Sequence, residues 1–226
     1  MKIAIIGYGK MGHMIEDVAR SRGHEIVARI DVGDAFDLKD ADVAIEFTTP
    51  ATAKDNILRA WAQGVPVVCG TTGWKPEELK GEGFELKEVD SKKLIVESKT
   101  GKVMLVWSSN YSVGVNIFFE LNKFLAEQMT DQAQYMPSIK EIHHIHKLDK
   151  PSGTAKTLAE QIRETDLSRY RNIEDIEIES VREGEVPGTH EVTWDSEEDT
   201  IVITHIAKGR RGFALGAVLA AEEIVG

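Results

Sequence analysis

The sequence predicts an α/β protein with two domains, the first built on a parallel sheet and the second, an α+β domain, on a mixed sheet. Up to residue 107, short apolar runs alternate with helical stretches, which is the order of parallel strands joined by crossover helices. Beyond residue 113, several strand-like runs follow one another and favour a mixed or antiparallel sheet. The composition, 42% hydrophobic and 29% charged over 226 residues, is that of a folded globular chain.

Strands and helices alternate in the first part of the first domain. Strands are predicted at 1–6, 25–30, 42–47, 65–69, 94–97 and 103–107, with helices at 10–21 and 52–63. In the second domain we expect helices at 114–128 and 152–164, and strands at 139–146, 176–181, 190–194 and 200–205. An Ala-rich helix at 213–225 is expected to pack back on the first domain.

Charge and hydropathy exclude several classes of function. The net charge of −11 argues against a nucleic-acid partner, because such binding needs a basic surface to replace the counterions of the phosphates. No apolar run reaches the ~18 residues of a membrane span, and the N-terminus resembles a strand rather than a signal peptide. The single cysteine, Cys69, is typical of a buried strand end. We therefore expect a cytoplasmic protein with no membrane partner.

A glycine loop follows the first predicted strand and opens the first predicted helix. It fits the pattern G-x-G-x-x-G with the residues Gly7, Tyr8, Gly9, Lys10, Met11 and Gly12. The glycines permit a tight turn, close approach of a pyrophosphate and close helix–strand packing, and the helix N-terminus faces the anion. Asp31 follows about 20 residues later at the end of the second strand, where a carboxylate accepts hydrogen bonds from the adenosine ribose. These features favour a Rossmann-type dinucleotide site; a glycine-rich turn beside a solvated aspartate is the alternative.

Asp31 also bears on the choice of cofactor. Its carboxylate repels the 2′-phosphate of NADPH, and no arginine follows in Asp31-Val32-Gly33, so NADH is favoured. Lys10 and Arg29 keep NADPH open as the alternative.

Two further loops fall where parallel strands are predicted to end, which is where ligands bind in such sheets. The first contains Phe47 and Thr48, and the second contains Gly70, Thr71 and Thr72. Small and hydroxyl-bearing residues allow backbone amides to approach the nicotinamide half of a cofactor. Two ordinary turns are the alternative interpretation.

The stretch from Glu141 to Ala155 is the most informative part of the chain. If it is extended up to Lys147, then His143 and Lys147 share one face of a strand and can act on one ligand. A helix then opens at Ser152, Gly153 and Thr154, which offers N–H donors and hydroxyl groups to a carboxylate or phosphate. We infer an anionic substrate.

Three closely spaced histidines raise two alternatives, a metal site and a purely structural cluster. Only His144 and His146 point the same way on a strand, and no nearby cysteine or helical pair completes a tetrahedral set. We therefore predict that no metal is bound.

Several strings together resemble the 4-hydroxy-tetrahydrodipicolinate reductase family, also called dihydrodipicolinate reductases. They are GYGKMG, GTTG, SSNYSVGVN, HHIHKLDKPSGTA and VREGEVPGTHEV, in this order along the whole chain. The resemblance implies NAD(P)H-dependent reduction of a small cyclic dicarboxylate, 4-hydroxy-tetrahydrodipicolinate, to tetrahydrodipicolinate in lysine and diaminopimelate biosynthesis. A different Rossmann-type amino-acid dehydrogenase and a non-catalytic NAD-sensing module are the alternatives.

The resemblance also implies roles for particular residues. His143 becomes the general acid/base and Lys147 a second proton donor, although a solvated lysine is the alternative for Lys147. His144, Gly153 and Thr154 are implied to contact the substrate. Cofactor contacts are implied at the glycine loop, at Asp31, at Gly70 to Thr72 and, before the second domain, at Ser108, Ser109, Asn110 and Tyr111. For Arg210, a cofactor or interdomain role and a surface role are both open.

The resemblance also implies a function for each domain and an oligomeric state. Residues 1–111 with 206–226 are expected to form the dinucleotide-binding domain, and residues 112–205 the substrate-binding and oligomerisation domain. A homotetramer formed through the sheet of the second domain is implied.

Overall fold

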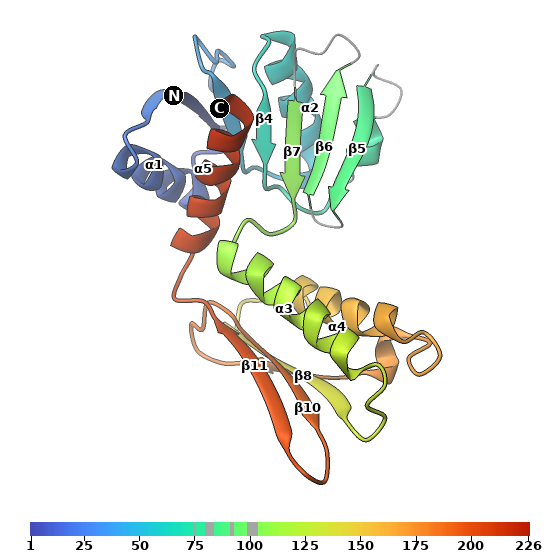
Figure 1. The fold of residues 1–226 in the computed structure, drawn as a ribbon. Coiled ribbons are helices and arrows are strands. Elements are labelled where there is room, and N and C mark those ends of the chain that lie inside the picture. The colour runs from blue at the N-terminus through green and yellow to red at the C-terminus, as the bar shows by residue number, and fades with distance from the viewer. Residues whose placement is uncertain (75, 80–83, 91–92, 99–103) are drawn as a thin grey trace. The chain divides into compact units, whose positions relative to one another are not determined.

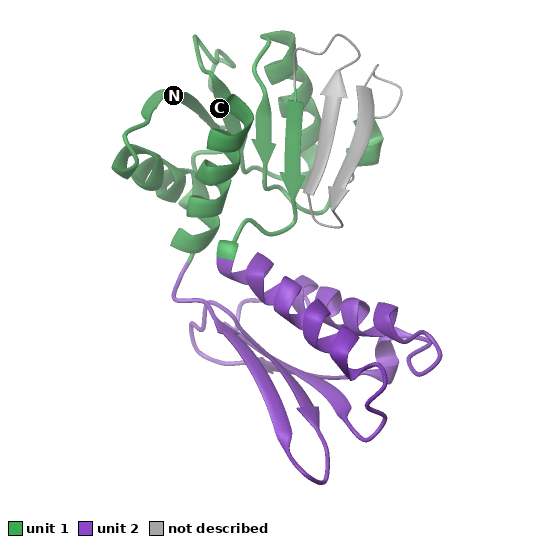
Figure 2. Cartoon of the chain, viewed as in Figure 1, with its two compact units in different colours: residues 1–113, 210–226 green, residues 114–209 purple. Residues whose placement is uncertain are grey.

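The computed structural model divides the chain into two compact units (Figure 2). Unit 1 comprises residues 1–113 and 210–226, and unit 2 comprises residues 114–209, so the chain leaves and re-enters unit 1 within a few residues of the expected boundaries at 111 and 206. The structure describes residues 1–226 except 75, 80–83, 91–92 and 99–103, and it describes no side chains from 80 to 103.

Unit 1 is built on a seven-stranded sheet with the order β2-β1-β3-β4-β7-β6-β5 (Figure 1). Its parallel part consists of β1 (Lys2–Ile6), β2 (Glu25–Ile30), β3 (Val43–Glu46), β4 (Val67–Cys69) and β7 (Met104–Ser108). Two antiparallel strands, β6 (Lys93–Ser98) and β5 (Phe84–Asp90), extend the sheet beyond β7. The predicted parallel sheet is confirmed. β5 was not predicted, and Val103 of the last predicted strand lies outside the described residues.

Helices cover both faces of this sheet. α1 (Lys10–Ser21) and α5 (Arg211–Val225) pack on one face, where Ile15, Val18 and Val218 are buried in a single core cluster. α2 (Pro50–Ala62) packs on the other face through Ile57 and Ala60. It begins two residues before the predicted start because Pro50 suits the first turn of a helix. A short 3-10 helix, η1 (Pro76–Leu79), follows β4. The expectation that the last helix packs on the first domain is confirmed.

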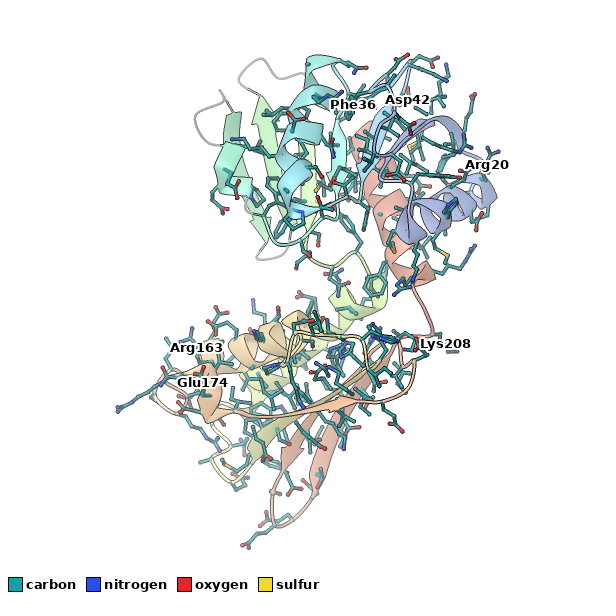
Figure 3. The ribbon with its side chains drawn as sticks, turned by 180° about the vertical axis from the view of Figure 1, so that it is seen from behind. Arg20, Phe36, Asp42, Arg163, Glu174 and Lys208 are labelled. Atoms are coloured by element: carbon teal, nitrogen blue, oxygen red, sulfur yellow. The ribbon has the colours of Figure 1, made fainter. Side chains whose placement is uncertain are left out.

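Unit 2 is a four-stranded mixed sheet with two helices on one face (Figure 1). Its strands are β8 (Met136–His143), β9 (Glu177–Arg182), β10 (Thr189–Asp195) and β11 (Thr200–Ile206), in the order β11-β10-β8-β9. Only the β8–β9 pair is parallel. The helices are α3 (Val113–Met129) and α4 (Gly153–Thr165), and a 3-10 turn, η2 (Ile173–Asp175), precedes β9. In Figure 3, Arg163 labels the last turn of α4 and Glu174 labels η2.

One predicted element is wrong in a way that matters for the site. β8 was expected to continue to His146, but it ends at His143. The chain then turns, with the Lys147 amide donating a hydrogen bond to the His144 carbonyl over 3.1 Å. The parallel partner β9 ends at Arg182, opposite His143, so the residues after His143 have no β9 residues to pair with. His143 and Lys147 therefore do not share one face of a strand, contrary to the prediction.

Within the described part of the chain, every helix is too short or too polar to cross a lipid bilayer.

Candidate active site

A cleft of about 630 Å³ opens in unit 1 at the carboxyl ends of the parallel strands. Its lining combines the three predicted loops with one residue at the start of α5, namely Gly9, Lys10, Met11, Phe47, Thr48, Pro50, Gly70, Thr71, Thr72 and Arg210. β1 and β3 are neighbours in the sheet although β2 lies between them in sequence, so the strand order reverses beside this cleft. Dinucleotides bind at such a reversal in open α/β sheets.

The three loop glycines play different steric roles. Gly7 has φ +92°, and a Cβ there would lie 2.1 Å from the Phe47 carbonyl oxygen. A Cβ on Gly12 would lie 2.4 Å from the Gly7 carbonyl oxygen. A Cβ on Gly9 would meet nothing within 4 Å. Gly7 and Gly12 are therefore needed for packing, whereas Gly9 leaves open space over the backbone for a ligand.

The N-terminus of α1 suits an anion. Gly9 is its N-cap and makes no side-chain capping hydrogen bond, so the first N–H groups of the helix have no competing side chain at this position. Lys10 and Arg210 add positive charge to the lining of the cleft. The residues present therefore fit the pyrophosphate of a dinucleotide, and Arg210 lies on the cleft.

Glu46, at the end of β3, organises the two other loops, and sequence reasoning missed it. Its carboxylate is fully buried and accepts hydrogen bonds from the Thr48 hydroxyl, from the Thr71 hydroxyl at 2.8 Å and from the Cys69 thiol at 2.9 Å. The Thr48 amide donates to Thr71 Oγ1 at 2.8 Å. Burial, reinforced by the Glu46 charge, raises the pKa of the Cys69 thiol, so the thiol remains protonated. The signal in the sequence was a single acid ending an apolar strand.

Close packing also fixes the aromatic wall of the cleft. A Cβ on Gly70 would lie 2.1 Å from the Phe47 ring, and the ring centroids of Phe47 and Tyr111 are 6.0 Å apart. The Tyr111 hydroxyl is buried and lies 2.7 Å from the Val106 carbonyl and 3.0 Å from that of Cys69. The side chain of Tyr111 thus serves the core, so its predicted cofactor contact depends on the backbone.

The remaining predicted contacts before unit 2 lie in a turn. Ser108 is buried, and its hydroxyl donates to the Asn110 carbonyl at 3.0 Å. Asn110 Oδ1 accepts from the Ser112 amide at 2.9 Å, and Ser109 is exposed. None of Ser108, Ser109 and Asn110 lines the cleft described above.

Asp31 is exposed at the end of β2, and its Oδ1 accepts a hydrogen bond from the Val32 amide at 2.9 Å. Arg29, which was expected to attract a 2′-phosphate, is bound to Glu16 through Nε at 2.6 Å. The hydroxyl of Tyr8 donates to the same carboxylate over 2.5 Å. The charge of Arg29 is therefore partly neutralised within unit 1.

Unit 2 gathers three polar side chains from three strands around His143. His143 Nδ1 contacts Glu141 Oε2, and Arg182 Nη2 donates to Glu141 Oε1 at 3.0 Å. The ring of His190, on β10, lies edge-on to that of His143 with 5.0 Å between centroids. Glu141, His143 and His190 are all buried.

The surroundings shift the pKa values of these groups in opposing ways. Burial lowers the pKa of His143, with help from the charges of Lys147 and Arg182, and the Glu141 carboxylate opposes this shift. Burial raises the pKa of Glu141, but the Ser180 hydroxyl, Arg182 and His143 outweigh it, so the net shift is downward. Burial next to His143 lowers the pKa of His190 to about 3. At neutral pH, the cluster holds an ionised Glu141 and a neutral His190.

The other predicted substrate and proton-donor residues lie on the two segments that follow β8. Lys147 forms an ion pair with Asp149 at 2.8 Å. Ser152 is the N-cap of α4; its Oγ accepts from the Ala155 amide at 3.2 Å and lies 3.1 Å from His190 Nε2. The Ser152 hydroxyl is therefore already engaged. Gly153 is exposed with open space where a Cβ would lie, and Thr154 is half-buried.

His144 is half-buried, and its ring centroid lies 6.0 Å from that of His146. The ligand atoms of Glu141, His143 and His190 lie within 4.8 Å of one another, a spacing that a metal ion also uses. In this arrangement Arg182 and Ser152 already contact Glu141 and His190, and the positive charge of the half-buried guanidinium opposes a second cation. The absence of a metal stays a prediction.

Sequence reasoning did not assign roles to Glu141, Arg182 and His190. The signals were present, since Glu141 alternates with His143 on β8 and the other two residues belong to the string VREGEVPGTHEV. The pairing of β8 with both β9 and β10 is what brings them together.

A dinucleotide-type cleft in one unit and a buried acid–base cluster in the other define a nicotinamide-dependent oxidoreductase. Family models show which one. The model for the N-terminal part of dihydrodipicolinate reductase matches residues 1–111, and the model for its C-terminal part matches residues 114–226. The chain belongs to the dihydrodipicolinate reductase family.

Individual relatives agree with this assignment. A protein of Christiangramia forsetii named 4-hydroxy-tetrahydrodipicolinate reductase is 46% identical over 98% of this chain and 91% of its own length. A protein of the same name from Archaeoglobus fulgidus is 34% identical over 99% of this chain and 94% of its own length. A solved structure, the dipicolinate-bound dihydrodipicolinate reductase from Paenisporosarcina sp. TG-14, shares the fold with a TM-score of 0.76 at 21% identity, covering 100% of this chain and 94% of that one.

These matches span the histidine-rich half of the chain as well as the nucleotide half. They give no support to the two alternatives, another amino-acid dehydrogenase and a non-catalytic sensing module.

Proposed function

We propose that this protein reduces 4-hydroxy-tetrahydrodipicolinate to tetrahydrodipicolinate with NAD(P)H, releasing NAD(P)+ and water, in the cytoplasmic route to diaminopimelate and lysine. The observation that carries the proposal is the buried contact between His143 and Glu141 in a chain whose two halves both match the reductase family. A histidine that exchanges a proton needs one ring nitrogen anchored and the other free, and this contact anchors Nδ1.

The reduction requires a hydride and a proton. Loss of the C4 hydroxyl group and a C3 proton as water would give the conjugated imine. NAD(P)H held in the cleft of unit 1 would then supply a hydride to C4 of this imine. The hydride leaves electron density at C3, and C3 is then protonated. We assign His143 as the donor of this proton. Lys147 is assigned as a second proton donor, and its charge attracts the dicarboxylate.

Binding of a substrate carboxylate is assigned to the start of α4. Gly153 and Thr154 lie in the first turn, where backbone N–H groups and the helix dipole favour an anion. Ser152 is assigned to contact the substrate through its backbone, because its hydroxyl caps the helix and contacts His190. His144 is assigned as a further substrate contact.

NADH is the preferred cofactor in this proposal. An exposed Asp31 carboxylate at the end of β2 repels a 2′-phosphate, and the pairing of Arg29 with Glu16 reduces the charge that would attract one. A ratio of kcat/KM for NADPH over NADH well above one contradicts this preference.

We also propose a homotetramer formed through unit 2. The helices of unit 2 pack on one face of its sheet, and on the edge strand β11 the apolar side chains of Val202 and Ile206 remain 48% and 65% exposed. Apolar strand surface of this kind is typical of a subunit interface.

The direct test follows NADH absorbance with freshly made product of dihydrodipicolinate synthase. Rapid oxidation supports the proposed function, and no oxidation at micromolar enzyme refutes it. His143→Gln should then lower kcat by roughly 10²-fold or more with little change in NADH affinity. His146→Gln is the matched control, because the His146 side chain is 68% exposed and its polar contact is with the exposed Glu185, through Nε2 at 3.2 Å.

A further inference from the structure

Glu141 is fully buried, and its two carboxylate oxygens contact different groups. Oε2 contacts His143 Nδ1, while Oε1 accepts from Arg182 Nη2 at 3.0 Å and from the Ser152 amide at 3.3 Å. One carboxylate thus connects the predicted acid to the start of α4. Buried ion pairs seldom stabilise a fold more than apolar residues of the same shape would, so stability alone gives no reason for this one.

The guanidinium of Arg182 has a second set of contacts. Its Nε donates to the Lys147 carbonyl at 3.2 Å, and Nη2 donates to the Asp149 carbonyl at 2.5 Å. Arg182 therefore binds the backbone on both sides of Leu148, in the segment that carries Lys147. Contacts from the segments of both predicted proton donors therefore meet at one ion pair, between the buried Glu141 and the half-buried Arg182.

We propose that the Glu141–Arg182 ion pair positions both proton donors of the proposed reaction, His143 through Glu141 and Lys147 through Arg182. The inference rests on the proposed function, because it takes His143 and Lys147 as the donors. Neither Glu141 nor Arg182 touches the substrate in this scheme; they are positioning residues.

The geometry also selects the working nitrogen of His143. Glu141 is ionised and its Oε2 contacts His143 Nδ1, so this contact favours a proton on Nδ1 and leaves Nε2 to exchange a proton with the substrate. Nε2 faces Gly188, where a Cβ would lie only 3.1 Å away, so the glycine keeps room beside this atom. The charged and titratable groups around the imidazole are Glu141 on β8, Arg182 on β9, His190 on β10 and Lys147 in the following turn.

The first test is Glu141→Gln, which keeps the shape and removes the charge. We expect kcat to fall about 10²-fold, within the range that a positioned acid–base group contributes, with the Kd for NADH unchanged. The loss of a negative charge lowers the pKa of His143, so the high-pH limb of the kcat profile should move to lower pH. The control is Glu179→Gln, which breaks an exposed ion pair with Lys140 on the same sheet. Equal effects of both substitutions would overturn the proposal.

A double-mutant cycle separates this inference from the proposed function. If Glu141 acts through His143, then Glu141→Gln has no further effect on kcat in a His143→Gln background. If His143→Gln alone leaves kcat unchanged, the proposed role of His143 fails. If His143→Gln lowers kcat and the second substitution lowers it again by the full factor, only the positioning role fails.

The same logic tests Arg182. Arg182→Lys keeps the charge beside Glu141 but loses the fork that reaches the Lys147 and Asp149 carbonyls. We expect at least a tenfold lower kcat, and no further loss in a Lys147→Met background. A full additional loss in that background refutes the link to Lys147.

A measurement on the unmodified protein covers the case in which these variants do not fold. In ¹⁵N-histidine-labelled protein, His143 should show the Nδ1–H tautomer when neutral, and its resonance is identified by its absence in His143→Gln. The Nε2–H tautomer at His143 would overturn the proposal.

Discussion

His190 makes a specific prediction about acid stability. It is 5% exposed, and its Nε2 lies 3.1 Å from Ser152 Oγ, which already accepts a hydrogen bond from the Ala155 amide. The Ser152 hydroxyl still has one proton to donate, and a neutral His190 can accept it at Nε2. Protonating His190 would remove this acceptor and place a charge in a ring whose centroid lies 5.0 Å from that of His143.

The magnitude follows from the two pKa values. Burial lowers the pKa of His190 to about 3 in the folded chain, against about 6.5 in the unfolded chain. Only the unfolded chain binds the proton between these values, so stability is complete above about pH 6.5 and is lost as the pH falls toward 3. The loss grows to about 1.4 kcal/mol per pH unit and reaches about 2 kcal/mol by pH 5. The upper limit for the whole window is about 5 kcal/mol.

Hydrogen exchange of the β8 and β10 amides measures the opening free energy of this sheet separately from unit 1. We expect His190→Gln, which cannot titrate, to be less stable than wild type at pH 7 but to lose less stability by pH 5. His146→Gln removes an imidazole that is 68% exposed and should keep the wild-type slope. If wild type and His190→Gln fall in parallel between pH 7 and pH 5, the reasoning about His190 is wrong.

Two further predictions concern the glycine loop and the assembly. Gly9→Ala places a methyl group where nothing lies within 4 Å, so stability should stay within about 0.5 kcal/mol while the Kd for NADH rises at least tenfold. Gly7→Ala, with its Cβ 2.1 Å from a backbone oxygen at φ +92°, should lower the unfolding free energy by about 2 kcal/mol or more. Thermal melts with fluorescence titrations check both, and equal loss of stability refutes the distinction. Ile206→Lys should reduce the mass measured by light scattering without changing NADH affinity; an unchanged mass contradicts the proposed interface.

The fold was largely predictable because its signals are local. The loop from Gly7 to Gly12 combines a tight turn with a helix start, and both are encoded within a few residues. Strand periodicity likewise predicted most of the described elements. It placed the end of β8 wrongly because a strand ends where its partner ends, and β9 stops opposite His143.

The site residues that were not predicted are defined by contacts between positions far apart in the sequence. Glu46 is separated from Thr71 by 25 positions, and Arg182 from Glu141 by 41. An acid in an apolar strand is as typical of a solvated edge as of a buried network until its partners are known. The proposed role of His143 came from its motif, but the groups that shift its pKa could be identified only from the pairing of β8 with β9 and β10.

The placement of α5 affects the order in which the chain becomes structured. This helix contributes Ala214, Ala217 and Val218 to the core on one face of the sheet in unit 1, although unit 2 separates it from the rest of that unit in sequence. Lys208, labelled in Figure 3, lies just before the chain returns to unit 1. During synthesis, unit 2 is therefore made before α5, when one face of the sheet in unit 1 is still uncovered. The apolar surface beneath α5 stays exposed until residues 211–225 are made, so unit 1 reaches its full stability after unit 2.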